Sequence, residues 1–159
     1  MLECVVNISE GRDRATIDAI AAACGPALLD VHTDADHHRS VLTLAGRDLQ
    51  DAALAARDLT DEVAERLDLS GHRGVHPRLG AVDVVPFVAL APTAASTAVE
   101  AAREYAEWVV AAHGVPVFLY GDADPQARSL PEARRDAFRT RAPDLGPAKP
   151  HPRLGAVAV

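Results

Sequence analysis

The order of strands and helices predicted for the first part of the chain constrains its fold more than any other feature of the sequence. Apolar runs with alternating or helical periodicity predict six elements there. They are strands over Leu2–Ile8, Ala27–Val31, Ser40–Ala45 and Ala81–Leu90, and helices over Asp13–Cys24 and Arg47–Leu67. The order β-α-β-β-α-β is that of the ferredoxin-like split unit, in which helices pack on one face of an antiparallel sheet.

Four further elements extend this core. They are a helix that ends at His113, strands over Val115–Tyr120 and Ala156–Val159, and a short helix over Leu130–Arg139. Thr93 can cap the first of these helices and Gly114 stops it. Pro86 interrupts the fourth strand, which indicates an edge position or a bulge. We therefore expect an α/β (α+β) fold with a ferredoxin-like βαββαβ core, extended to a six-stranded mixed sheet with helices on one face.

Length and charge narrow the class of protein. The 159 residues favour one domain over 1–159, and 16 basic against 23 acidic residues give a net charge of −7. Such a surface does not suit non-specific nucleic-acid binding, so an anionic ligand requires locally gathered basic residues. The opening residues do not have the pattern of a signal peptide and no apolar run approaches about 20 residues, so we expect neither secretion nor a membrane span, and a cytoplasmic protein. Cys4 and Cys24 lie in apolar settings and are expected to be buried thiols.

One heptapeptide, HPRLGAV, occurs twice, at His76–Val82 and at His151–Val157. Each copy leads into a predicted strand, and the proline after each histidine restricts that histidine to an extended conformation. The first copy continues a glycine-hinged loop, Ser70–Arg78, that holds two histidines and two arginines. Such a loop can place a proton-transfer group beside an anion clamp. The alternative is a turn used twice, with solvated side chains.

Two other polar segments are weaker candidates. The stretch HTDADHHRS, His32–Ser40, contains the triplet Asp36-His37-His38, which could ligate a divalent metal, or could be a solvated turn or an organic-ligand site. The stretch Asn7–Arg12 leaves a strand and enters a helix, where backbone amides can hold an anion or a carbonyl. Ser9 or Glu10 could instead simply cap that helix.

Five segments, taken together and in order, resemble the formiminotransferase family, specifically its N-terminal subdomain. They are LECVVNISEGRD, ADHHRSVLTLAG, HRGVHPRLGAVDVVPF, GVPVFLYG and DLGPAKPHPRLGA, and the likeness runs from Leu2 to Val159. The resemblance implies transfer of a formimino group from N-formimino-L-glutamate to N5 of tetrahydrofolate, releasing L-glutamate, in histidine breakdown. It also implies two facing α/β subdomains with the folate between them, tetrahydrofolate as co-substrate, and no metal.

The resemblance assigns roles to residues of this chain. His76 falls on the family's catalytic histidine, a general acid/base, and Leu145–Leu154 falls on its folate-binding loop. The candidate substrate- and folate-binding residues are Asn7, Ser9, Glu10, Asp36, His38, Arg39, Arg78, Gly80, Arg128, Gly146, Pro147, Lys149, His151, Pro152 and Arg153. The chemistry fits independently, because a histidine can move protons near neutral pH and arginine forks can hold glutamate carboxylates. Arg39, Arg73, Arg78, Arg128 and Arg153 could supply those forks.

The chain also departs from the family pattern. The family usually has Pro-Asn where this chain has Val6-Asn7, and many members carry Asp and Asn at the positions of His32 and His38. After Arg134 the family's Gly-Glu-aromatic becomes Asp136-Ala137-Phe138, which puts a glutamate contact there in doubt. The second subdomain is absent from this chain, so we expect a homo-oligomer or a partner in the form of that subdomain.

Two alternative functions remain open from the sequence. The first is a non-catalytic folate-binding or dimerisation module, favoured if the second half is truly missing. The other is a metal-dependent phosphohydrolase built on the Asp36-His37-His38 triplet, although the further Asp-rich motifs of such enzymes are lacking.

Overall fold

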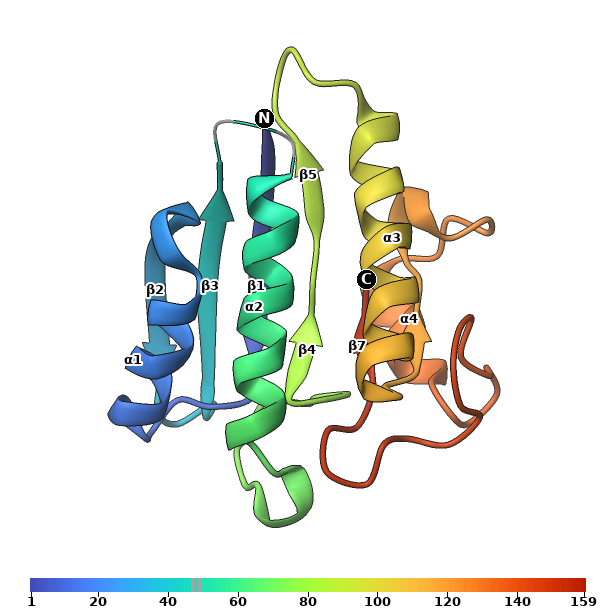
Figure 1. Ribbon diagram of the computed structural model, residues 1–159. Coiled ribbons are helices and arrows are strands. Elements are labelled where there is room, and N and C mark those ends of the chain that lie inside the picture. Colours follow the sequence, from blue (N-terminus) through green and yellow to red (C-terminus); the bar gives the residue numbers. More distant parts are fainter. Residues whose placement is uncertain (47, 49) are drawn as a thin grey trace.

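A computed structural model describes residues 1–46, 48 and 50–159 as a mixed sheet with helices packed against it (Figure 1). The strands are β1 (Leu2–Ile8), β2 (Leu28–Asp34), β3 (Arg39–Ala45), β4 (Val82–Val84), β5 (Phe87–Ala89), β6 (Val117–Phe118) and β7 (Val157–Ala158). The helices are α1 (Arg14–Ala23), α2 (Asp51–Arg66), α3 (Ala95–His113) and α4 (Leu130–Asp136), with short 3₁₀ turns at Gly25–Ala27, Leu69–Gly71 and Gly121–Ala123.

The first half of the sheet has the expected ferredoxin-like order. The sheet runs β2-β3-β1-β4-β7-β6, and the pairs β2–β3, β3–β1 and β1–β4 are all antiparallel. Strands β7 and β6 then add to β4 in parallel, with β7 between the other two. The predicted βαββαβ core and its mixed extension are therefore confirmed.

The predicted strand over Ala81–Leu90 is in fact two strands. β4 and β5 both pair with β1, and they are separated at Val85 and Pro86, where proline cannot donate a ladder hydrogen bond. The register against β1 also shifts between Asn7 and Ile8. The sheet of the described residues consequently has seven strands where six were expected.

Helices α1, α2 and α3 lie across one face of the sheet (Figure 1). Burial alternates along β1 and β3, so that residues such as Val6, Ile8 and Leu42 are fully buried against those helices. A smaller cluster forms where Phe118 of β6 meets Ala137 and Ala156. Phe118 follows Val117 of the main core, so strand alternation places this cluster on the opposite face.

The helix ends explain most of the predicted boundaries. Asp13 caps α1 by accepting hydrogen bonds from the amides of Ala15 and Thr16, and α3 ends at Gly114 in the left-handed conformation, with φ of 65°. The prediction that Thr93 caps α3 is wrong. The N-cap of α3 is Ala94, and the Thr93 hydroxyl accepts a hydrogen bond from the N-terminal ammonium of Met1 instead. The predicted start of the second helix at Arg47 lies outside the described residues.

The two HPRLGAV copies lie side by side. The Ala81 amide donates to the Leu154 carbonyl at 2.9 Å, the Ala156 amide donates to the Leu79 carbonyl at 3.0 Å, and Gly80 bridges Gly155. Each copy leads into a strand, β4 or β7, as predicted. The repeat therefore builds the junction between the ferredoxin-like core and its parallel extension.

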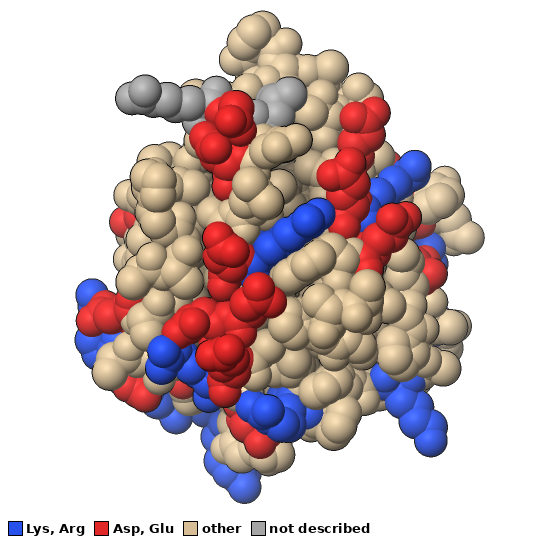
Figure 2. All heavy atoms as spheres, viewed as in Figure 1, with Lys and Arg blue, Asp and Glu red and all other residues tan. Residues whose placement is uncertain are grey.

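Two general features bear on what the protein contacts. Every helix of the described residues is too short or too polar to cross a membrane. Acidic side chains gather over the helix-covered face, and much of the visible Lys and Arg lies toward its lower end, where the loop that follows α2 is found (Figures 1 and 2). Cys4 and Cys24 are free and buried, as expected.

Candidate functional site

His76 lies in the loop that joins the Leu69–Gly71 turn to β4. Its Nδ1 is 3.3 Å from Nη1 of Arg39, and its ring meets the ring of His37 edge-on at a centroid distance of 5.9 Å. Arg78 braces the loop by donating to the carbonyl oxygens of His72, at 2.9 Å, and His76, at 3.3 Å. The imidazole is thus held between β3 and the turn that precedes it.

Arg39 is fixed by one residue each from strands β1 and β4. Its Nη2 and Nε donate to Oδ1 of Asn7 at 2.7 and 3.1 Å, and its Nη1 donates to Oδ2 of Asp83 at 2.6 Å. Arg39 and Asn7 alternate with the buried residues Ser40 and Ile8, so both side chains stand on the sheet face opposite helices α1–α3. The site therefore opens on the face that those three helices leave uncovered.

Asp83 anchors this cluster, and the sequence analysis did not single it out. Its carboxylate is fully buried and binds two guanidinium groups, those of Arg39 and Arg134. It also accepts from the backbone amides of Leu79, at 2.5 Å, and Gly80, at 3.4 Å. The sequence does contain a sign of this role, because Asp83 is a charged residue in the middle of the apolar run Ala81–Phe87. A buried aspartate needs cationic or hydrogen-bonding partners.

The surroundings of His76 favour its neutral form. Partial burial lowers the pKa of His76, and the nearby Arg39 guanidinium lowers it further. A neutral imidazole can accept a proton, which is the first requirement for a general base near pH 7.

A second pair of imidazoles lies beside this cluster. His38 and His72 stack at a centroid distance of 4.0 Å, and burial lowers the pKa of both rings. His38 Nδ1 accepts from the Gly11 amide at 3.1 Å and lies 3.4 Å from the carboxylate of Glu10. The pair connects the β1–α1 loop to the loop that carries His76.

The backbone amides at the start of α1 are already occupied. Oε1 of Glu10 accepts from the amides of Gly11, Arg12 and Asp13 at 2.7 to 2.9 Å. Ser9 is buried, and its hydroxyl donates to the Gly80 carbonyl at 2.8 Å. This segment therefore supports the first HPRLGAV copy with its own side chains, in place of the open anion site that the sequence suggested.

The loop Leu145–Leu154 passes along the ends of α2 and α3. Arg153 donates to the carbonyls of Ala64 and Leu67 at the end of α2 and lies near Asp68, and the Leu69 amide donates to the Arg153 carbonyl at 2.9 Å. Nδ1 of His151 accepts from the amides of Arg153 and Leu154. The hydrogen-bond partners of His151 among the described residues thus lie within its own turn, whereas His76 contacts Arg39 of β3.

Several other residues predicted to bind substrate or folate are not part of the cluster around His76. Some bind other side chains, and others lie on exposed loops. Arg128 holds the buried carboxylate of Asp124 through Nε at 2.5 Å and Nη2 at 2.9 Å, which draws the pKa of Asp124 well below its usual range. Asp36, Lys149, Pro147 and Gly146 lie on exposed loop segments, and Gly146 takes a φ of 87° beside α3. Exposed Arg73 has no hydrogen bond or ion pair within the described part of the chain.

The Asp36-His37-His38 triplet does not converge on one point. His37 Nδ1 binds Asp34 at 2.7 Å, whereas His38 faces Glu10 and His72. In residues 1–46, 48 and 50–159, no group of three or more His, Cys, Asp or Glu side chains is placed to hold a metal ion. The geometry gives the metal-dependent alternative no support.

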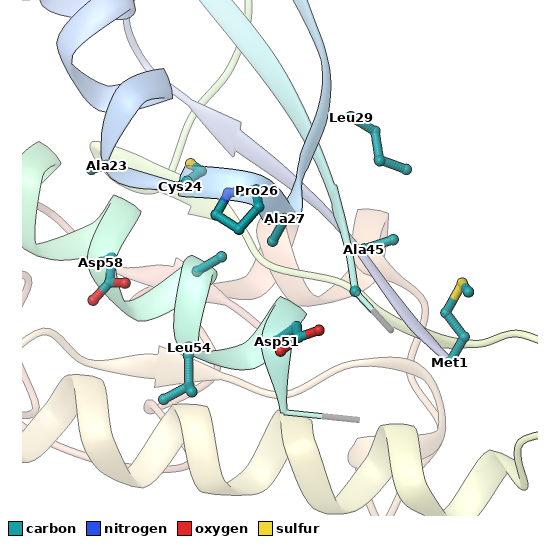
Figure 3. A pocket seen from close by; sticks show the side chains of 13 residues that line it. Met1, Ala23, Cys24, Pro26, Ala27, Leu29, Ala45, Asp51, Leu54 and Asp58 are labelled. Carbon is teal, nitrogen blue, oxygen red and sulfur yellow. The ribbon is translucent and has the colours of Figure 1, made fainter. Parts of the chain in front are cut away.

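A larger cavity than the one beside His76 lies at the other end of the molecule from this cluster. It measures about 800 Å³, opens between the end of α1 and the start of α2, and is lined by apolar side chains such as Met1, Leu29 and Leu54, with Asp51 and Asp58 at its edge (Figure 3). A cavity of about 430 Å³ lies against His76. The smaller cavity is the better candidate for a functional site, because a titratable imidazole and several arginines line it together.

Comparison with known proteins places the chain in a family. Residues 1–159 match the family described as the formiminotransferase domain, N-terminal subdomain. The chain belongs to this family. It is 38% identical to a glutamate formimidoyltransferase of Streptococcus pyogenes serotype M1, over all of this chain and 58% of the relative. It is 39% identical to a glutamate formimidoyltransferase of Thermoplasma acidophilum, over 93% of this chain and 54% of the relative.

Relatives of a longer kind match the same region. The formimidoyltransferase-cyclodeaminase of Sus scrofa is 35% identical over 98% of this chain and 31% of the relative. This formiminotransferase subdomain therefore spans a little over half the length of the two glutamate formimidoyltransferases it matches. The resemblance on which the sequence analysis relied is confirmed at the level of the family.

Two of the departures of this formiminotransferase subdomain from the family pattern lie on β2 and at the end of α4. His32 is exposed on β2, where it pairs with Val41 of β3, and its Nε2 lies 2.9 Å from Asp30. Ala137 and Phe138 pack against Phe118 beneath α4. Asp136 uses its backbone carbonyl to accept from the amides of Arg139, Thr140 and Arg141, which closes the turn after α4.

Proposed function

We propose that this chain contributes the proton-transfer half of a folate-dependent formimino transfer, from N-formimino-L-glutamate to N5 of tetrahydrofolate. The observation that carries the proposal is the position of His76, held by Arg39 at the edge of an arginine-lined cavity. Membership of the formiminotransferase family and the names of its relatives support it. In this proposal tetrahydrofolate is a co-substrate.

The reaction needs one group that takes a proton and returns it. N5 of tetrahydrofolate forms a bond to the formimino carbon and loses its proton, while the bond from that carbon to the glutamate nitrogen breaks and this nitrogen gains a proton. His76 can carry the proton between the two nitrogens, giving 5-formiminotetrahydrofolate and L-glutamate. The lowered pKa of His76 keeps its ring ready to accept.

Arg39 sets the state of the ring before substrate binds. A guanidinium donates hydrogen bonds and accepts none, so Nδ1 of His76 is the acceptor in their contact, and the neutral ring then carries its hydrogen on Nε2. For Nε2 to accept a proton, Arg39 must release Nδ1 so that the ring hydrogen can move from Nε2 to Nδ1. A substrate carboxylate that draws Arg39 toward itself would do this, which couples substrate binding to the activation of His76.

The decisive experiment is a transfer assay on the chain with both substrates. His76→Ala should lower turnover by about 10²- to 10⁴-fold and leave the affinity for tetrahydrofolate nearly unchanged. His113→Ala is the matched control, because His113 binds Asp61 at 2.7 Å on the helix-covered face. Turnover of His76→Ala within a few-fold of the unmutated chain would remove His76 from the mechanism.

A non-catalytic folate-binding module is the second candidate, because the chain spans 58% and 54% of the relatives it matches. The same assay separates the two functions. Tetrahydrofolate binding without transfer by the unmutated chain would favour the binding module. Transfer by the chain alone would favour the enzyme.

A further inference from the structure

The cavity beside His76 has a strongly cationic wall that no candidate residue of the sequence analysis accounts for. Its lining residues are His76, Pro77, Leu130, Pro131, Arg134, Arg135 and Arg139. Three arginines thus gather around one small cavity, although the whole chain has a net charge of −7. Such local gathering of basic residues is what an anionic ligand requires on an acidic protein.

The three arginines do not have the same freedom. Arg134 is fixed, because it binds the buried carboxylate of Asp83 and donates to the Pro77 carbonyl at 3.0 Å. Arg135 and Arg139 are exposed, and neither guanidinium makes a hydrogen bond or ion pair with another described residue. Two cationic forks beside the imidazole are therefore available to a ligand.

Nearby carboxylates are engaged elsewhere. Glu132 precedes Arg135 in α4, but its Oε2 accepts from both the amide, at 2.8 Å, and the hydroxyl, at 2.6 Å, of Ser129. The Arg139 backbone is fixed in the turn after α4, where its amide donates to the Asp136 carbonyl at 3.1 Å. The pKa of Glu132 is lowered mainly by its hydrogen bonds from Ser129 and further by the charge of Arg135, but neither Arg135 nor Arg139 has its guanidinium tied up in a hydrogen bond or ion pair with a described residue.

We infer that Arg135 and Arg139 form a carboxylate-binding subsite next to His76 and determine which substrates this site accepts. This inference rests on the proposed function, in which both substrates carry glutamate carboxylates. A carboxylate held here stands on the α4 side of the imidazole, while Arg39 holds the β3 side. The source is either the glutamate of the formimino donor or the glutamate tail of the folate.

The test measures binding of two separate probes, L-glutamate and tetrahydrofolate, by calorimetry. The double variant Arg135→Gln/Arg139→Gln should bind one of them about tenfold more weakly, because each charge-assisted hydrogen bond contributes appreciably to affinity. The affected probe identifies the source of the carboxylate. The control is Arg14→Gln/Arg103→Gln, which removes the same charge from exposed positions on α1 and α3 and should bind both probes as the unmutated chain does.

The outcomes separate this inference from the proposed function. Equal affinities in the double variant and the control overturn the subsite, and so does a failure of the unmutated chain to bind either probe. Formimino transfer with an unchanged KM in the double variant keeps the function and removes the subsite. Probe binding that is lost in the double variant, in a chain without transfer activity, keeps the subsite and removes the function.

Discussion

Two buried aspartates, Asp83 and Asp124, each bind arginine side chains, but in different parts of the protein. Asp83 binds Arg39 and Arg134 beside His76, and Asp124 binds Arg128 and lies 3.6 Å from Arg141 at the corner after β6. Both carboxylates neutralise guanidinium groups away from water, which a buried charge requires. Only the first cluster includes an imidazole, so the same arrangement serves a candidate site in one place and a loop corner in the other.

The two arginines near the histidine pairs allow a crossed test of the electrostatics. Arg39 lowers the pKa of His76, and Arg12 lowers the pKa of His38. Arg39→Gln should therefore raise the pKa of His76 toward its ordinary value, and Arg12→Gln should raise that of His38 and leave His76 unchanged. NMR titration of the imidazole signals measures both.

The lowered pKa of His76 also predicts how the transfer rate depends on pH. With its pKa lowered, His76 stays neutral as the pH falls to below the ordinary histidine value of about 6.5, so the acid limb of the transfer rate should lie below that value. In Arg39→Gln the limb should move upward in pH. A His76 titration that is the same in Arg39→Gln and the unmutated chain would show that Arg39 does not set the state of the ring.

At the level of elements, the two HPRLGAV copies show that identical residues take different local structures. In the first copy the amides of Leu79 and Gly80 donate to Asp83, whereas the second copy has Ala158 at the corresponding position and closes a tight turn, with His151 and Gly155 exchanging backbone hydrogen bonds. Gly155 takes a φ of 73°, and Gly80 has no positive φ. The shared seven residues therefore do not determine the turn by themselves, and the two copies first differ after them at the eighth residue, Asp83 or Ala158.

Features of the fold that depend on local sequence could be predicted, whereas contacts between distant residues could not. Strand β1, the β-α-β-β-α-β order and the stop at Gly114 follow from local patterns, and these predictions are confirmed. Asp83 was missed because its role depends on partners that are distant in sequence, such as Arg39, which lies 44 positions away. Periodicity identifies a buried strand, but it cannot say which guanidinium neutralises a charge within it.

The close approach of the two copies makes a prediction about stability. A Cβ on Gly80 would lie 2.0 Å from the Ala156 carbonyl oxygen, and one on Gly155 would lie 2.2 Å from that of Leu79. Gly80→Ala and Gly155→Ala should each lower the free energy of unfolding by about 2 kcal/mol or more, because the β4–β7 junction must separate. Chemical denaturation measures the loss.

Gly71→Ala serves as the control for this pair, since a Cβ there meets nothing within 4 Å and Gly71 has no positive φ. Its stability should stay close to that of the unmutated chain. If Gly80→Ala and Gly155→Ala unfold at the same denaturant concentration as Gly71→Ala, the two copies do not form the tight junction described above.

At the scale of the whole molecule, the sheet has one covered and one largely open face. Helices α1–α3 cover the first, and the cluster around Phe118 covers only the β6–β7 end of the second. On the open face, Val5 and Val41 are only partly buried and Val88 is 41% exposed. The Arg39–His76 cluster stands at the edge of this face, so whatever covers the face also closes the candidate site.

We expect the isolated chain to cover this face with a second copy of itself. The chain spans 58% and 54% of two relatives, so in a longer protein of that kind the remaining residues could take the same place. Exposed apolar patches of monomers are usually small, and a charge in the middle of such a patch opposes association. Analytical ultracentrifugation should therefore find self-association of the unmutated chain, and Val88→Lys should shift it toward monomer.

The matched control for this prediction is Leu54→Lys. Leu54 is also an exposed apolar residue, 53% accessible, but it belongs to α2 on the helix-covered face. Its variant should associate as the unmutated chain does, because a contact through the open sheet face leaves α2 in solvent. If the unmutated chain sediments as a monomer at high concentration and still binds tetrahydrofolate tightly, the open face needs no partner, and the edge that carries His76 is complete in one copy.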